Sequence, residues 1–243
     1  MAPDLRTLYF FATTSAVLTF SFFGFFPIMG LKVYFYSFKM AMLSSIAAYG
    51  FRPVYSIKRP DSWGLGGLRA WGTSIYNQNN VQMVMYSCLF LSGRPITIAL
   101  GPLLITCMYQ WVTIANKLME GRPLWERFGK GLYARMEGAM VQALVMMAAM
   151  EIATAFYLVM EMFTGNRNPL RMVVYWNFLR MRYRNPDNIV LRLKYAAYTT
   201  SFYHQEVWKI IASKLAPVLN IRQVQPVVNF AKTWFTGVRP HVA

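Results

Sequence analysis

The sequence predicts an all-α fold: a polytopic helical membrane protein with three spans, or four, plus interfacial amphipathic helices. Hydrophobic residues make up 56% of the 243-residue chain and charged residues only 14%, which is too apolar for an ordinary soluble domain. The formal net charge of +16 lies in short basic segments between long apolar runs. Lys and Arg at a membrane surface explain this pattern, so we expect anionic lipid headgroups and no nucleic acid as partners.

The first predicted span covers about residues 8–30. The run from Thr7 to Leu31 contains no charged residue, and at 1.5 Å per residue it is long enough to cross ~30 Å of hydrocarbon. Asp4 and Arg6 precede this run, and no obvious small-residue cleavage site follows it. We therefore expect an uncleaved anchor rather than a signal peptide.

Residues 31–51 are apolar but carry Lys32 and Lys39 on one helical stripe. This pattern favours an interfacial helix in the membrane plane, with both lysines reaching the headgroups. A second span that closes a hairpin with the first remains the alternative. The following residues, 52–80, are polar and rich in Gly and Pro, which predicts a loop.

Residues 81–116 form a second long apolar stretch, interrupted by Gly93-Arg94-Pro95. We favour a partly inserted helix over about 81–93, followed by a span over 95–116. A tight hairpin around Arg94 is the alternative. Pro102 should kink the span because its ring removes a backbone hydrogen bond. A charged loop over 121–137 then leads to the last span, 138–163.

This reading divides the chain into a membrane domain, residues 1–186, and a basic amphipathic tail, residues 187–243. The largest net positive charge lies in residues 164–243, which hold twelve Lys and Arg against two acidic residues. Because cytosolic segments next to spans are enriched in these residues, we expect the tail to face the cytosol.

Glu151 lies in the middle of the last predicted span, where a carboxylate needs a partner. We expect a structural contact with Arg94, with Gln110 or with another subunit, and keep a proton or ion site as the alternative. The methionines of the same span indicate an adaptable packing surface and not a metal site.

Two segments after the last span combine aromatic and basic residues. Just past the last span, aromatic and basic residues interleave at Tyr175, Trp176, Arg180 and Arg182, which predicts side chains at headgroup depth. A helical stripe through Leu191, Tyr195, Tyr198 and Phe202, with Arg192 and Lys194 off the stripe, predicts an amphipathic helix on the membrane or against the spans.

A final short helix over residues 227–235 would place Trp234 and Phe235 in the membrane interface. For catalysis the sequence offers no recognisable motif. His204 and His241 are far apart, and Cys88 and Cys107 lie inside apolar runs. No phosphate-binding loop or nucleophile motif occurs. We therefore expect no enzyme activity, no metal and no cofactor.

Several motifs resemble those of one membrane protein family. Ser92 to Thr97, Gly101 to Leu104 and the pair Asn116-Lys117 resemble conserved segments of the transmembrane protein 33 family, also called the Krüppel homologue 2 family, which includes yeast pore-membrane relatives. Tyr175 to Leu179 with Arg182-Tyr183 resembles its aromatic segment after the last span. Glu151 matches an acidic position, and Tyr34 to Arg59 resembles a post-anchor stretch. The resemblance covers most of residues 8–186, whereas the tail beyond Asp187 matches poorly.

The resemblance implies a non-enzymatic protein of the endoplasmic reticulum and nuclear envelope that shapes or scaffolds membrane. It also implies reticulon-like proteins or nuclear-pore components as partners. The alternative is an accessory structural subunit of a larger membrane complex, in the mitochondrial inner membrane. The Met-rich last span, the single carboxylate Glu151 and the pI of about 10.1 suggest this alternative.

Overall fold

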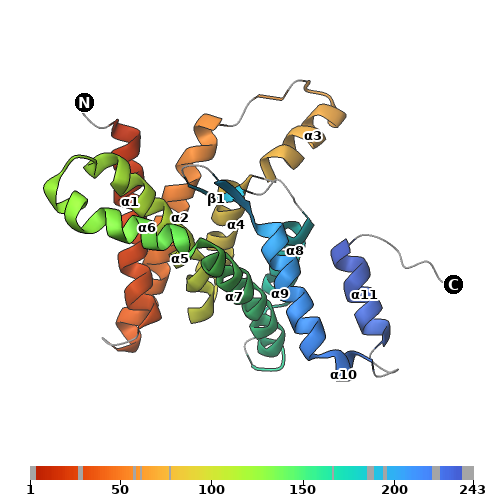
Figure 1. Cartoon of the computed structure of the whole chain (residues 1–243). Helices are drawn as coiled ribbons and strands as arrows, with labels where there is room; N and C mark the ends of the chain where they lie inside the picture. The colour runs from red at the N-terminus through yellow and green to blue at the C-terminus, as the bar shows by residue number, and fades with distance from the viewer. Residues whose placement is uncertain are drawn as a thin grey trace.

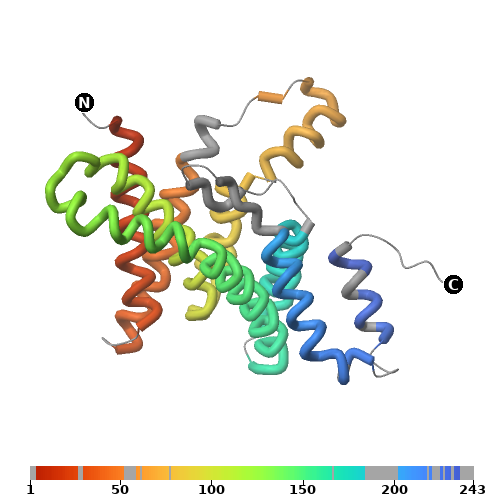
Figure 2. Tube along the Cα trace, viewed as in Figure 1, coloured from red at the N-terminus to blue at the C-terminus, as the bar shows by residue number. Residues whose placement is uncertain are grey.

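A computed structural model describes the backbone of residues 4–26, 30–56, 59–60, 62–76, 78–165, 167–184, 189–193, 196–220 and 225–236. Long helices packed side by side form most of this part of the chain, and Figure 2 traces its course from the N-terminus (red) to the C-terminus (blue).

The elements follow one another as helices with one β-hairpin (Figure 1). They are α1 (Leu5–Phe25), α2 (Leu31–Ser56), α3 (Leu65–Tyr76), α4 (Asn79–Leu91), α5 (Thr97–Met119), the π-helical turn η1 (Trp125–Gly129), α6 (Lys130–Gly138), α7 (Met140–Glu161), α8 (Pro169–Arg184), strands β1 (Ile189–Leu193) and β2 (Ala196–Thr199), α9 (Thr200–Lys214), α10 (Ala216–Leu219) and α11 (Gln225–Thr236).

Three of the described helices are long and apolar enough to cross a membrane: α1, α5 and α7. They correspond to the three predicted spans, with ends that differ by a few residues. The predicted fold class, a polytopic helical membrane protein, is therefore confirmed. The run lengths sufficed for this prediction because a span needs roughly 20 apolar residues at 1.5 Å each.

Helix α2 forms an antiparallel pair with α1. The hydroxyl of Tyr9, near the start of α1, donates to the carbonyl oxygen of Ala47 at 3.2 Å, and its ring centroid lies 4.6 Å from that of Phe51. Gly24, near the end of α1, lies against the backbone of Phe38, near the start of α2. A helix lying in the membrane plane would instead run across α1.

The antiparallel packing of α2 on α1 fits the hairpin alternative for residues 31–51, but α2 is not among the described helices that are long and apolar enough to span. Its placement in or across the membrane therefore stays a prediction. Lys32 and Lys39 are exposed on the outer face of α2. Its inner face is buried through Phe38, Met42 and Tyr49. The two lysines suggested an interfacial helix, but the apolar inner face determines how α2 packs.

Helix α4 corresponds to the predicted partly inserted helix and packs between α2 and α8 (Figure 1). Ser87 donates to Ser45 of α2 at 2.8 Å, and Tyr86 donates to the backbone oxygen of Ala99 in α5 at 2.6 Å. Both hydroxyls are buried, so hydrogen bonds replace their lost hydration. Pro102 lies inside α5, as predicted.

The spans α5 and α7 approach closely at Gly101. A Cβ atom at this position would overlap the Sδ atom of Met150 in α7. We predict that Gly101→Leu lowers the free energy of unfolding by about 1–3 kcal/mol, because it forces an extra side chain into a filled interface. Unfolding by SDS titration in mixed micelles measures this loss. Gly131→Leu is the control, since a Cβ there meets open space, and equal losses for both variants would contradict the prediction.

The tail does not begin with the predicted amphipathic helix. Residues 189–193 and 196–199 instead form an antiparallel hairpin, β1 and β2, and the helix begins only at Thr200. Tyr195 of the predicted stripe lies outside the described residues. The segment is rich in β-branched and aromatic residues, which fit a strand as well as an apolar helical stripe.

Helix α9 packs against α7 and α8, so the tail joins the helical bundle, one of the two placements that the sequence left open. The predicted final helix exists as α11, which packs against α8.

Candidate functional site: a buried ion cluster between the last span and the tail

Glu151 lies on the inner face of α7. Buried residues recur along this helix at Leu144, Met147, Ala148, Glu151, Ile152, Ala155 and Leu158. This spacing of three and four residues defines one face of an α-helix. Glu151 therefore points into the protein, and its side chain is only 1% exposed. A buried carboxylate needs strong partners, because desolvation disfavours its charge.

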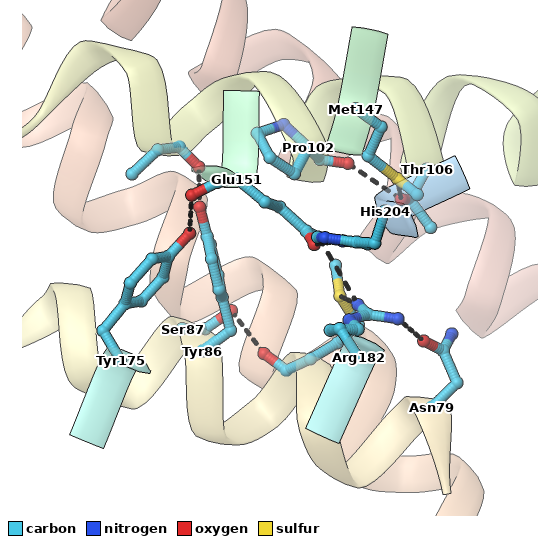
Figure 3. A network of polar contacts seen from close by, with 12 residues as sticks. Asn79, Tyr86, Ser87, Pro102, Thr106, Met147, Glu151, Tyr175, Arg182 and His204 are labelled. Carbon is cyan, nitrogen blue, oxygen red and sulfur yellow. Dashed lines mark hydrogen bonds and ion pairs between the residues drawn. The ribbon is translucent and has the colours of Figure 1, made fainter. Parts of the chain in front are cut away.

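The first partner is His204 of α9. Its Nε2 atom lies 2.7 Å from Oε2 of Glu151, and the imidazole is fully buried (Figure 3). An imidazole that carries its proton on Nε2 donates this proton to the carboxylate. The short distance is typical of a hydrogen bond to a charged acceptor. The contact fastens the tail helix α9 to the middle of the span α7.

The second partner is Arg182, near the end of α8. Its Nη2 atom lies 3.7 Å from Oε1 of Glu151, and both side chains are buried. Nη1 of the same guanidinium donates to Oδ1 of Asn79 at 2.9 Å, and Nη2 lies 3.3 Å from Sδ of Met83. The ring of Phe178 lies below the guanidinium, with 5.1 Å from Cζ to the ring centroid. Arg182 therefore joins α4, α7 and α8.

Tyr175 of α8 adds a third contact to the same part of α7. Its hydroxyl donates to the backbone oxygen of Glu151 at 2.9 Å, as Figure 3 shows. Burial, together with the nearby Tyr86 and Glu151, raises the pKa of the Tyr175 phenol well above its usual value. The phenol is therefore neutral and acts as a hydrogen-bond donor.

Three buried atoms of the cluster have no hydrogen-bond partner within the described residues: Oε1 of Glu151, Nε of Arg182 and Nδ1 of His204. Oε1 still lies within ion-pair distance of Arg182. Glu151 and Arg182 carry opposite charges, and His204 adds a hydrogen bond to the same carboxylate. A charge-balanced cluster is the arrangement that a buried site tolerates best.

A second buried arginine lies at the other end of α8. Arg171 Nη1 lies 4.0 Å from Oε2 of Glu161, the last residue of α7. Its Nη2 donates to the backbone oxygen of Arg94 at 3.2 Å, and its Cζ lies 4.7 Å from the ring centroid of Phe90. Burial lowers the pKa of Arg171, and the charge of Glu161 opposes this shift. Arg171 and Arg182 thus attach the two ends of α8 to α7.

The predicted partners of Glu151 differ from the observed ones. Arg94 uses its backbone oxygen to accept from Arg171, and Gln110 has a buried Oε1 without a hydrogen bond inside the described structure. Glu151 instead pairs with Arg182 and His204. The need for a partner was evident from the sequence, but the helix packing that selects the partner was not.

Eight of the ten predicted headgroup residues fall into three groups. Tyr175 and Arg182 are buried and face the protein, so their assignment to headgroups is corrected. Phe235 is also buried, among Trp176, Tyr183 and Trp208, and Arg180 lies over Trp234 with 4.7 Å from Cζ to the ring centroid. These side chains dock α11 on α8 and α9. Lys32 and Lys39 are exposed.

Two further predicted headgroup residues lie near the hairpin. Arg192 lies in strand β1, and Lys194 lies outside the described residues. The residue that sequence reasoning missed is His204, which was considered only as a catalytic candidate. A histidine in an apolar helical segment, in a chain with an unpaired carboxylate in a span, was the available signal.

Comparison with known proteins gives one match. A family model described as Transmembrane protein 33/Nucleoporin POM33 matches residues 2–226, nearly the whole chain. No curated protein and no solved structure shows significant similarity.

Proposed function

Since the chain belongs to the Transmembrane protein 33/Nucleoporin POM33 family, we propose that it is a non-enzymatic membrane protein that shapes or scaffolds the membrane of the endoplasmic reticulum and nuclear envelope. The family match and the three helices able to span make the chain a multi-pass membrane protein of this family. The shaping role is supported by one structural observation, the position of α8 and α9 along α7.

The ion pairs that attach α8 and α9 to α7 lie on one half of α7, from Glu151 to Glu161. Arg171, near the start of α8, pairs with Glu161 at the end of α7, whereas Arg182, near the end of α8, pairs with Glu151 at its middle. Helix α9 starts at the middle, through His204, and returns toward the end of α7, where Trp208 lies 6.0 Å from Phe156 between ring centroids. Each of the three helices contacts the other two, and Figure 1 shows α9 beside α7.

This arrangement makes the protein wider in one leaflet than in the other. Helices of 15 or 16 residues measure about 22–24 Å, less than the ~30 Å hydrocarbon core. Because α8 and α9 are fixed to the C-terminal half of α7, they add cross-section on that side of the bilayer. Inserting more helix volume into one leaflet favours curvature toward the other. The basic tail adds attraction to anionic lipid on the same side.

Reconstitution into vesicles tests this role. We expect the full chain, reconstituted with phosphatidylcholine and phosphatidylserine, to shift vesicles to smaller diameters or tubules, as seen by electron microscopy. A chain ending at residue 186 lacks α9 and α11 and should not do so. Lys209→Gln, which removes one exposed charge and its ion pair with Glu206 but leaves α9 and α11 in place, is the control. Unchanged vesicle diameters with the full chain would refute the proposal.

The cellular site and the partners belong to the same proposal. We expect a fluorescently tagged chain to mark the reticulum and the nuclear rim, and to co-purify with reticulon-like or pore membrane proteins in mild detergent. A mitochondrial pattern would instead support the accessory-subunit alternative.

A further inference from the structure

The connection between α5 and α7 is a folded amphipathic segment, although its composition predicted a charged loop. The turn η1 and helix α6 together cover residues 125–138. Trp125 is buried and its Nε1 donates to Oδ1 of Asn116, near the end of α5, at 3.0 Å. The hydroxyl of Tyr109 donates to the backbone oxygen of Met136 at 2.9 Å. One face of the segment is thereby fixed to α5.

A second face carries an exposed apolar stripe. Leu124, Phe128 and Leu132 recur every four residues and are 77%, 65% and 47% exposed. Residues four apart in an α-helix are rotated by slightly more than one full turn about the helix axis. In the wider π-helical turn they are rotated by slightly less than one full turn. Because η1 precedes α6, the two angular deviations have opposite signs and largely cancel. The three side chains therefore lie on one side of the segment.

Basic residues border this stripe on its outer side. Arg127 and Arg135 are exposed and follow Leu124 and Leu132 by three residues, and the guanidinium of Arg127 lies 5.3 Å from the ring centroid of Phe128. The acidic Glu126 points away from the stripe and pairs with Lys130 at 2.5 Å. Apolar side chains edged by arginines, with the carboxylates turned away, are typical of a helix that lies in a lipid interface.

The position of the segment also points to lipid. It connects two helices able to span the membrane, α5 and α7, and runs back along the last turns of α5, from Asn116 to Tyr109. The exposed apolar surface of α7 begins with Val141, directly after α6. The chain therefore passes from the stripe directly into a helix with exposed apolar side chains that is able to span the membrane.

From these observations we propose that residues 122–138 form an interfacial anchor. Leu124, Phe128 and Leu132 enter the outer hydrocarbon of one leaflet, and Arg127 and Arg135 contact lipid phosphates. Since α7 leads from this segment to α8, the anchor lies on the membrane face opposite the start of α8. The inference rests on α5 and α7 crossing the membrane and is independent of the shaping role.

A fluorescent probe on the stripe tests this placement. The full chain carries Cys88→Ser and either Phe128→Cys or Leu132→Cys, each labelled with a nitrobenzoxadiazole dye, while Cys107 is buried and remains. Ala134→Cys places the same dye on the polar face of α6 as the control, because Ala134 is exposed. The proteins are reconstituted in phosphatidylcholine and phosphatidylserine vesicles that contain dibrominated phosphatidylcholine.

We expect the bromolipid to quench the dyes at 128 and 132 at least ~3-fold more strongly than the dye at 134, as for side chains buried ~5–10 Å into the interface. Quenching by aqueous iodide equal to that at 134 would overturn the proposal. Shielding from both quenchers would also overturn it, because a protein would then cover the stripe. Using two stripe positions guards against a local disturbance by either cysteine.

Discussion

Replacing Glu151 by glutamine should lower the free energy of unfolding by about 3–5 kcal/mol, because it leaves a buried arginine without its counter-charge. Glu151 and Arg182 are 1% and 0% exposed, so water cannot take over the lost interaction. SDS titration in mixed micelles, followed by circular dichroism, measures the loss. The prediction fails if Glu151→Gln unfolds within about 1 kcal/mol of the unchanged chain.

A matched variant separates burial from charge. Glu206→Gln removes a carboxylate from the exposed pair with Lys209 in α9, and such a surface pair is worth less than about 1 kcal/mol. Combining Glu151→Gln with Arg182→Met should recover most of the loss, since both charges then disappear together. A double variant that is as unstable as Glu151→Gln alone would show that the ion pair is not the reason.

The second large effect concerns α11. Phe235→Ala should destabilise the docking of this helix by about 3–5 kcal/mol, the usual cost of deleting a buried aromatic side chain. Phe235 is buried with ring centroids 5.2 Å from Trp208 and 5.6 Å from Tyr183. Limited proteolysis should cut the chain between α10 and α11 much faster in the variant.

Phe230→Ala is the control, because Phe230 belongs to the same helix but is 68% exposed. It should leave the cleavage rate nearly unchanged. If the two variants are cut at the same rate, α11 is not held by the aromatic cluster around Phe235.

The sequence predicted the spans well because a membrane crossing depends on local composition. The apolar runs of α1, α5 and α7 are long enough by themselves, whatever the rest of the chain does. The family resemblance rested on similarly local motifs, and the match over residues 2–226 confirms it.

The packing partners could not be predicted in the same way. Lys32 and Lys39 gave α2 an interfacial pattern, yet the buried Phe38 and Tyr49 pair it with α1. For Glu151, the partner His204 is 53 residues away along the chain. Only the fold brings the two together, and neither residue's neighbours in the sequence point to the other.

The middle connection and the tail show the same limit. The charges around η1 and α6 predicted a loop. The sequence did not show that Trp125 packs against the end of α5, with Gly129 leaving room for its ring. The ring of Trp125 occupies the space where a side chain at residue 129 would lie. Similarly, Tyr175 and Arg182 are of residue types that are common at headgroup depth, but their position beside α7 buries them.

Cross-linking in the bilayer tests most directly the central claim, that the tail helix α9 packs beside the last span. With Cys88→Ser, Phe156→Cys and Trp208→Cys in the reconstituted full chain, a short thiol cross-linker should join α7 and α9, because the rings of Phe156 and Trp208 lie 6.0 Å apart between centroids. Leu5→Cys with Trp208→Cys is the control, since α1 begins far from α9 (Figure 1). Efficient linkage of the 156–208 pair alone is the predicted result, whereas no linkage of this pair in the folded protein would contradict the account.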